Sequence, residues 1–310
     1  MTRFVFMGTP QFAVIILDHL EAAGYVPALV VTQPDRPCGR GQKETPSPVA
    51  LWAFERGIPT VKPDNCRAAD LREELRVIAP QCLITAAFGQ ILPASILTIP
   101  VKGCLNIHAS LLPRYRGASP VQAALLAGDK ETGVTLMRMD EGLDTGPLLA
   151  QARMVLTDEI NAGELDLALA RLGGELIAAK LEAYLEGKLS SRAQDEAFAS
   201  MTHRIKKADG RVDFTRSAPD VHNHIRAMNP WPGAFTFLDK KRYKLNRTRV
   251  YDGEIASQSV GELFIIGKSM VVSCGQGAIE LLEIQPQSGS SMPCEACAHN
   301  FVQGSVFDVC

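Results

Sequence analysis

Asparagine and histidine stand two residues apart in the apolar segment 104–108, as Asn106 and His108. Side chains two residues apart project from the same face of a strand, so both can point into one site while Ile107 packs the other way. The pair would combine an amide donor with an imidazole that titrates near neutral pH. The alternatives are structural: an amide that satisfies backbone groups at a strand end, and a hydrogen-bonded histidine of the core.

Carboxylates occur downstream in the glycine-containing segment 139–147, which includes Asp140, Glu141 and Asp144. Loops of this kind commonly present active-site groups on a rigid scaffold. The carboxylates therefore shift the interpretation of Asn106 and His108 from a structural role toward a functional one.

The first 190 residues predict the scaffold that would hold these side chains. Apolar strand patterns alternate with helical patterns, the strands at 3–7, 28–32, 60–61, 82–86, 104–108 and 132–139 and the helices at 12–23, 48–56, 68–78, 120–127 and 162–185. This alternation predicts an α/β fold, a Rossmann-like and mostly parallel sheet with helices on both faces. In such sheets, ligands bind beyond the carboxyl ends of the strands.

From residue 211 the pattern changes to short strands separated by Gly and Asp turns, at 234–238, 243–250, 261–266, 270–273 and 279–284. They predict a small antiparallel β-barrel of the OB type. We therefore expect a catalytic domain at 1–189, a linker at 190–204 and a C-terminal barrel domain at 205–310.

Charge is nearly balanced over the whole chain, with a formal net charge of -2 and a pI near 6.3. This balance argues against a protein that coats nucleic acid over its whole surface, but a local basic face remains compatible with it. Such a concentration occurs within ten residues, at Lys240, Lys241, Arg242, Lys244, Arg247 and Arg249.

The sequence predicts a cytoplasmic protein without a membrane span. No segment approaches the roughly 18 apolar residues that a span requires, and the N-terminus lacks the apolar region of a signal peptide. The eight cysteines are scattered, as suits free thiols in a reducing compartment. Cys294 and Cys297 form the only close pair, and no second pair completes a zinc site, so we expect no metal.

Several segments together resemble the folate-dependent formyltransferases. The motifs that carry the resemblance are Asn106-x-His108, Ser110-Leu-Leu-Pro113, Arg116-Gly-Ala-Ser-Pro120 and Leu143-Asp144-Thr-Gly146. The resemblance implies that Asn106, His108 and Asp144 form a catalytic trio and that 10-formyltetrahydrofolate is the co-substrate.

The implied reaction gives each member of the trio a physical role. Attack of a neutral amine on the formyl group produces a tetrahedral species with a negative oxygen and a positive nitrogen, and both charges need preorganised partners. Asn106 and a protonated His108 would bind the oxyanion. Asp144 would keep His108 charged and help to remove the amine proton, directly or through water.

Two segments are candidates for the folate site. The resemblance implies the first, which comprises Ser110, Leu111, Leu112 and Pro113. The second lies at 88–93, where a flat apolar slot with backbone donors would suit the pterin ring, and its candidate residues are Phe88, Gly89, Ile91 and Leu92. The alternative for this second segment is an ordinary turn between a strand and a helix.

The amine acceptor must be inferred from other segments. Residues 33–43 resemble the loop that enters the acceptor end of tRNA in formyltransferases acting on methionyl-tRNA, and Arg36, Arg40 and Lys43 could pair with phosphates. The six basic residues of 240–249 could hold the tRNA backbone. We therefore expect charged initiator tRNA as the partner, although both segments are also compatible with solvated surface. No feature predicts an obligate protein partner.

Three other functions compete with this interpretation. A nucleotide-sugar formyltransferase would share the trio, but it would not need the basic segments. A dinucleotide-binding oxidoreductase would need a GxGxxG turn, and Gly8-Thr-Pro-Gln-Phe12 lacks that spacing. A non-catalytic RNA-binding adaptor would leave the Asn-His-Asp group without a purpose.

Overall fold

The computed structural model describes residues 3–38, 43–256 and 259–309. The chain divides into two compact units, each built from segments that are not consecutive. The first comprises Met1–Gly117, Thr132–Met154 and Asp166–Met201, and the second comprises Ala118–Glu131, Val155–Leu165 and Thr202–Cys310. No helix in the described ranges is both long and apolar enough to cross a membrane.

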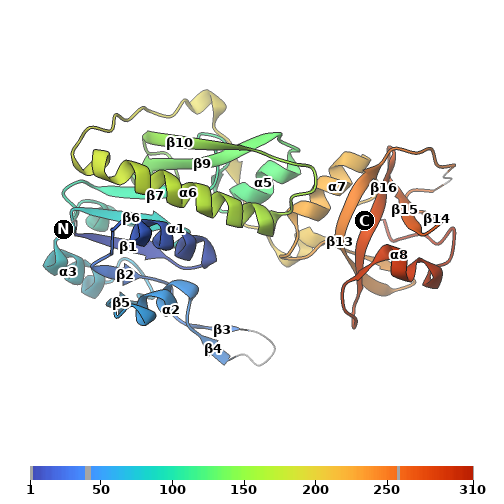
Figure 1. Ribbon diagram of the computed structural model, residues 1–310, viewed down its shortest axis with the longest axis horizontal. Helices are drawn as coiled ribbons and strands as arrows, with labels where there is room; N and C mark the ends of the chain where they lie inside the picture. The colour runs from blue at the N-terminus through green and yellow to red at the C-terminus, as the bar shows by residue number, and fades with distance from the viewer. Residues whose placement is uncertain (1–2, 39–42, 257–258, 310) are drawn as a thin grey trace. The chain divides into compact units, whose positions relative to one another are not determined.

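A seven-stranded sheet forms the centre of the first unit (Figure 1). In spatial order its strands are β10 (Leu148–Val155), β9 (Glu131–Arg138), β7 (Cys104–His108), β6 (Cys82–Ala86), β1 (Phe4–Gly8), β2 (Leu29–Val31) and β5 (Thr60–Val61). The pairs from β7 to β5 are parallel, whereas β9 runs antiparallel to β7. The predicted, mostly parallel α/β sheet is confirmed, and β10 is an edge strand that the sequence patterns did not indicate.

Helices cover both faces of this sheet, as expected for buried strands without polar alternation. They are α1 (Gln11–Ala22), α2 (Pro48–Glu55), α3 (Ala69–Ile78), α4 (Ala94–Leu97) and α6 (Ala162–Leu185). On one face, Leu71 of α3 and Ile96 of α4 share a core cluster with Val5 and Leu83 of the sheet.

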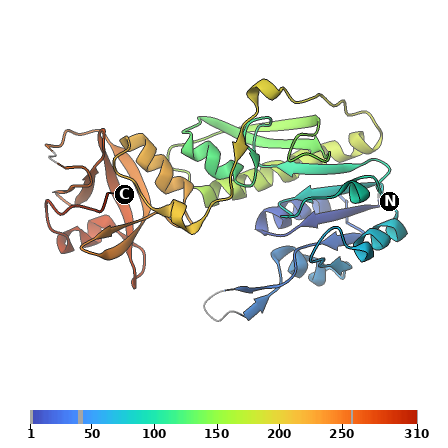
Figure 2. The ribbon, with the colours of Figure 1, turned by 180° about the vertical axis from the view of Figure 1, so that it is seen from behind.

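On the opposite face α6 packs so closely that it needs glycine. A Cβ added at Gly173 would lie 2.7 Å from Ile107 of β7 and 3.7 Å from Ile16 of α1. Figure 2, seen from behind, shows the strands in front of α6, which crosses before them in Figure 1. Ile107 therefore packs beneath a helix, and its neighbours on β7 face the other way.

A two-stranded hairpin occurs within the segment 33–43 and just beyond it. Strand β3 (Arg36–Cys38) pairs antiparallel with β4 (Lys43–Thr45), in the register Arg36↔Thr45. The sequence patterns predicted no strands here, because three-residue strands are too short to show periodicity.

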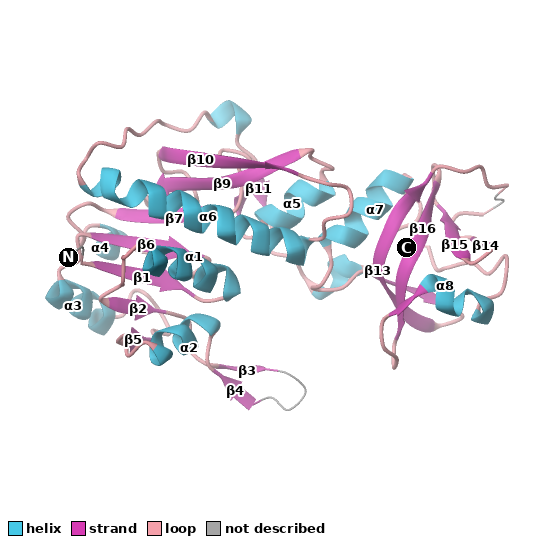
Figure 3. Ribbon diagram, in the orientation of Figure 1, coloured by secondary structure: helices cyan, strands magenta, loops and turns pink. Residues whose placement is uncertain are grey.

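The second unit contains a curled antiparallel sheet that forms half a barrel (Figure 3). Its strands, in spatial order, are β12 (Phe235–Leu238), β13 (Lys241–Tyr251), β16 (Ala278–Pro286), β15 (Ser269–Ser273) and β14 (Leu263–Ile266), with β17 (Met292–Pro293) paired to β16. The prediction of a small antiparallel β structure after residue 211 is confirmed.

Helices accompany this sheet within the second unit, namely α5 (Pro120–Leu126), α7 (Ala218–Ala227) and the single turn α8 (Cys294–Cys297). The hydrophobic patterns did not predict α7. Its signal was present, because the hydroxyl of Ser217 caps the helix by accepting a hydrogen bond from the amide of Asp220, and a proline follows Ser217 in the first turn.

Candidate active site

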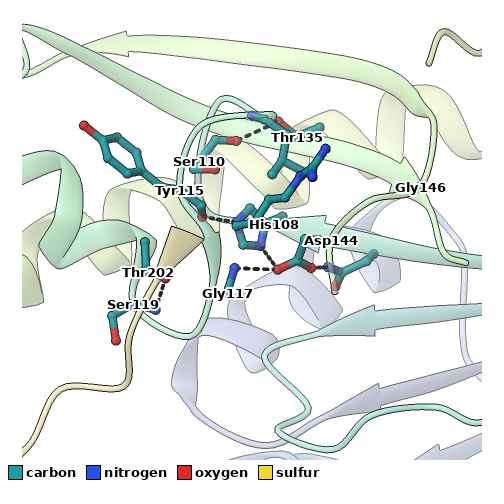
Figure 4. Close-up of polar contacts among 12 residues, drawn as sticks. His108, Ser110, Tyr115, Gly117, Ser119, Thr135, Asp144, Gly146 and Thr202 are labelled. Carbon is teal, nitrogen blue, oxygen red and sulfur yellow. Dashed lines mark hydrogen bonds and ion pairs between the residues drawn. The ribbon is translucent and has the colours of Figure 1, made fainter. Parts of the chain in front are cut away.

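Strand β7 places Asn106 and His108 on one face at the carboxyl end of the parallel part of the sheet. Asn106 pairs in register with Thr85 of β6, and His108, the last residue of the strand, pairs with Thr135 of β9. His108 is 6% exposed. Figure 4 shows the polar contacts that surround it.

Both ring nitrogens of His108 have a neighbour (Figure 4). Nε2 lies 2.9 Å from the backbone carbonyl oxygen of Tyr115, and Nδ1 lies 3.6 Å from Oδ2 of Asp144. A carbonyl oxygen can only accept, so Nε2 must carry a hydrogen and donate a hydrogen bond to the carbonyl of Tyr115. Nδ1 is therefore the nitrogen that faces the carboxylate.

Asp144 is held by donors on both of its carboxylate oxygens. Oδ2 accepts a hydrogen bond of 2.8 Å from the amide of Gly117, and Oδ1 lies 3.4 Å from Nδ2 of Asn106. Its backbone has φ of 55°, in the left-handed region that residues other than glycine adopt infrequently. Asp144, which is 38 residues from Asn106 in sequence, thus meets Asn106 and His108 at one point.

Thr85, which the sequence patterns did not single out, orients the amide of Asn106. Its hydroxyl lies 2.9 Å from Oδ1 of Asn106 and 2.9 Å from the carbonyl oxygen of Leu105. Because a hydroxyl can donate to the amide oxygen, the amide nitrogen is left to face Asp144. A single threonine in the otherwise apolar strand 82–86 was the available signal.

The loop that carries Asp144 is stabilised by its own side chains. Oδ1 of Asp140 accepts from the amide of Gly142 at 3.1 Å and from the hydroxyl of Thr145 at 2.7 Å. A Cβ at Gly146 would collide with the carbonyl oxygen of Arg138, so only glycine fits there. Asp140 therefore shapes the loop, and Asp144 is the carboxylate that reaches His108.

A later segment also reaches this site. Nε2 of Gln194 donates to the carbonyl oxygens of Asp144 and Gly146, at 2.7 and 2.8 Å. The buried guanidinium of Arg116 binds Oε1 of Gln194 and both carboxylate oxygens of Glu196. The hydrogen bond to Glu196 raises the pKa of Arg116. These contacts lie in the stretch 190–204, which the sequence suggested only as a linker.

The segment 110–113 turns two of its side chains inward. Ser110 is fully buried, and its hydroxyl donates to the carbonyl oxygen of Arg114 at 2.7 Å. Leu112 packs in a small core cluster with Met137 and Leu148. The side chains of Leu111 and Pro113 are partly exposed.

The segment 88–93 likewise contributes to the core. Phe88 and Leu92 are 5% and 3% exposed and belong to the cluster beneath the sheet, whereas Ile91 is 76% exposed. Gly89 has φ of 86°, which requires glycine, and the carbonyl oxygen of Phe88 accepts from the hydroxyl of Thr9. Ile91 is therefore an exposed apolar side chain of this segment, and Pro93 is partly exposed.

The first group of basic residues predicted to meet phosphates lies in the segment 33–43. Arg36 is exposed on β3 and donates to Oε1 of Gln33 at 3.1 Å, and Lys43 is exposed on β4. Arg40 lies outside the described residues.

Strand β13 and its preceding turn carry the second basic group. Arg249 binds the buried carboxylate of Glu280 at 2.6 Å, and Arg247 lies 3.5 Å from Glu164. The guanidinium of Arg242 stacks 4.0 Å from the centre of the Phe235 ring.

Two of the three lysines of the second basic group lie at the turn between β12 and β13, and Lys244 lies farther along β13, where it pairs with Phe235. Lys240 is in the turn itself with φ of 62°, and Lys241 begins β13. Lys240 and Lys241 are exposed and Lys244 is partly exposed. Among the described residues, the lysines are thus the members of the group without a carboxylate or aromatic contact.

Metal-binding clusters of His, Cys, Asp and Glu do not occur in the described part of the chain. Cys294 and Cys297 are buried, and burial raises the pKa of Cys294 to about 12. The thiol of Cys294 is thus protonated and unreactive at neutral pH.

The fold and the site define a class of protein: an α/β chain that presents an amide, an imidazole and a carboxylate at the carboxyl edge of its sheet. Such a group suits a reaction through a tetrahedral species, in which charge develops on oxygen and nitrogen. The chain belongs to the formyl transferase family, since residues 2–181 match that family and residues 204–301 match the formyl transferase C-terminal domain.

Similar proteins extend over nearly the whole chain. A methionyl-tRNA formyltransferase of Geobacter sulfurreducens is 45% identical and covers 94% of this chain and 91% of its own length. One of Myxococcus xanthus is 44% identical, covering 97% and 95%. The solved N-formyltransferase of Helicobacter canadensis, in complex with folinic acid and dTDP-3-aminofucose, aligns with a TM-score of 0.67 at 20% identity and covers 91% of this chain and 99% of that one.

Proposed function

We propose that this chain transfers the formyl group of 10-formyltetrahydrofolate to the free amino group of methionyl initiator tRNA, and so supports translation initiation in the cytoplasm. The observation that carries the proposal is the convergence of Asn106, His108 and Asp144 on one edge of the sheet. Methionyl-tRNA formyltransferases that are 39 to 45% identical over nearly the whole chain support this acceptor.

The reaction follows from the arrangement of the trio. The lone pair of the methionine amine attacks the formyl carbon, and the carbonyl electron pair moves onto the formyl oxygen. Collapse of this species breaks the bond to the folate nitrogen, which takes a proton as the amine loses one. The products are the formylated amine and tetrahydrofolate, and no covalent enzyme intermediate is needed.

Three side chains divide this work. Nδ2 of Asn106 and a protonated Nδ1 of His108 stabilise the oxyanion, because Nε2 of His108 is already committed to the carbonyl of Tyr115. Asp144 stabilises the charged imidazole and receives the amine proton, directly or through water. Thr85 keeps the amide of Asn106 with its nitrogen toward the reacting atoms.

The folate would lie against the segments 88–93 and 110–113. Phe88 and Leu92 support the first segment from the core, so contact would come from the backbone at Gly89 and from the exposed side chain of Ile91. In the second, the buried Ser110 and Leu112 fix the backbone, and Leu111 and Pro113 supply the partly exposed side chains.

The tRNA would be held by cations on both units. Arg36 and Lys43 lie on the two paired strands β3 and β4, where Arg36 pairs with Thr45 and Lys43 with Cys38, and Arg40 lies between them in the sequence. Of the six basic residues of 240–249 on the second unit, Lys240, Lys241 and Lys244 are the cations best able to meet phosphates. Arg242, Arg247 and Arg249 already contact protein groups and would contribute mainly to the local field.

The decisive experiment measures transfer of labelled formyl from 10-formyltetrahydrofolate to methionine-charged initiator tRNA, with methionine-charged elongator tRNA as the control. Rapid transfer to the initiator alone is expected. Turnover of an amino sugar nucleotide instead, with no tRNA product, would replace the acceptor and retain the chemistry. Loss of transfer in His108→Ala would tie the activity to the trio.

A further inference from the structure

Gln194 is the one half-buried side chain in an otherwise exposed segment, 191–198. Its amide nitrogen has two hydrogens, and the two carbonyl oxygens that accept from it belong to Asp144 and Gly146. A single side chain, 50 residues from Asp144 in sequence, thus holds the catalytic loop at two backbone positions.

Arg116 fixes which way this amide points. Nε and Nη2 of Arg116 lie 3.1 and 2.9 Å from Oε1 of Gln194, and a guanidinium only donates. The oxygen of Gln194 must therefore face Arg116, so its nitrogen faces the loop. The next residue, Gly117, donates its amide to Oδ2 of Asp144 at 2.8 Å. Gln194 thus holds the backbone carbonyl of Asp144, and the amide of Gly117 holds its carboxylate.

Asp144 needs such support because of its conformation. With φ of 55°, its backbone is in the left-handed region, which costs about 1 kcal/mol or more for a residue other than glycine. A strained conformation persists only where its surroundings hold it. A displacement of about 1 Å at a catalytic group can lower the rate about a hundredfold.

We propose that Gln194 is a positioning residue for Asp144 in the transfer reaction, an inference that rests on the function proposed above. It does not touch the substrates. It holds the carbonyls of Asp144 and Gly146 so that the carboxylate stays between His108, Asn106 and the amide of Gly117.

Gln194→Glu is the informative variant. It keeps an acceptor for Arg116, so the segment stays anchored, but it removes both donors and sets a carboxylate against two carbonyl oxygens. We expect kcat to fall about tenfold to a hundredfold with KM for folate and tRNA nearly unchanged. The kcat of Gln194→Ala should fall by a similar factor. A thermal melt of each variant establishes that it is folded.

A double-mutant cycle separates positioning from general structural support. In an Asp144→Asn background, Gln194→Glu should lower the residual rate less than twofold, because the carboxylate that it positions is already gone. Arg192→Ala is the matched control, since Arg192 lies on the same segment and donates to Gln151 instead of the catalytic loop. Its kcat should stay within about twofold of the wild type.

Two results would overturn the inference alone: a fully active Gln194→Glu, or a Gln194→Glu whose loss is the same in both backgrounds. A folded wild-type chain without any formyl transfer would instead overturn the proposed function and this inference with it.

Discussion

At the scale of single residues, the site depends on the hydrogen-bond partner of each polar atom. Nε2 of His108 donates to the carbonyl of Tyr115. The amide oxygen of Asn106 accepts from the hydroxyl of Thr85, and one carboxylate oxygen of Asp144 accepts from the amide of Gly117. One imidazole nitrogen and one amide nitrogen are left to meet the substrate, and their partner in the described part of the chain is the carboxylate of Asp144. Preorganised donors of this kind cost no rearrangement as charge develops.

Removing a member of the trio should therefore reduce the rate without unfolding the protein. His108→Ala and Asp144→Asn should each lower kcat for formyl transfer by about a hundredfold or more, because both groups act on charge that develops in the transition state. Rapid-quench assays with charged tRNA give kcat, and circular dichroism checks the fold. Rates near those of the wild type would refute the proposed roles.

Thr85 offers a finer test of the same site. Thr85→Val keeps the shape of the side chain but removes the hydroxyl that orients Asn106, so kcat should fall about three- to tenfold, equivalent to one hydrogen bond of about 1 kcal/mol. Thr85→Ser retains the hydroxyl and should remain close to the wild type. Steady-state kinetics would contradict this role if the serine and valine variants were equally active.

At the scale of elements, strand order decides what can meet. Strand β7 lies between β6 and β9, so Thr85 and Thr135 both come beside the motif that carries Asn106 and His108. The hairpin of β12 and β13 carries the second basic group. Lys240 and Lys241 lie at its turn and Lys244 lies on β13 opposite Phe235, while Arg247 and Arg249 farther along β13 contact carboxylates of the second unit.

The hairpin lysines should therefore matter for tRNA more than the arginines do. Replacing Lys240, Lys241 and Lys244 together with Gln should raise KM for tRNA several-fold at low salt and reduce its dependence on salt concentration, because fewer counterions are released. Folate KM should not change. Arg249→Gln is the matched control, because Arg249 is already paired with Glu280. An equal rise in KM for tRNA in both variants would argue against a larger role for the lysines than for the arginines.

At the scale of the whole molecule, one partly buried carboxyl links stability to pH. Burial raises the pKa of Asp166, on α6, from 3.8 to about 6. The folded protein thus favours the protonated form, so the stability that this group contributes is present below about pH 4 and is lost as pH rises through about 6.

Asp166→Asn should accordingly stabilise the protein above pH 7 and make little difference near pH 4. The gain at high pH should approach about 3 kcal/mol, at about 1.4 kcal/mol per pKa unit, as an upper bound. Melting temperatures across this range provide the measurement. Asp158 is the matched control: its hydrogen bond to Lys130 lowers its pKa, so Asp158→Asn should not stabilise at any pH. A stability gain that did not vary with pH would count against the assignment to Asp166.

The sequence by itself determined the scaffold and the chemistry of the motif. Unbroken apolar runs such as 82–86 indicate strands buried on both faces, and spacing of two residues places Asn106 and His108 together, because both patterns depend only on local backbone geometry. Helix α7 was also encoded locally, in the cap at Ser217.

The tertiary structure alone decided which partners complete the site. Thr85 is 21 residues from Asn106, Gln194 is 50 from Asp144, and Arg116 is 78 from Gln194. No periodicity connects positions so far apart, since their meeting depends on strand order and on the path of the chain after α6. For the same reason, the sequence could show six basic residues at 240–249, but only the fold showed which of them already pair with carboxylates.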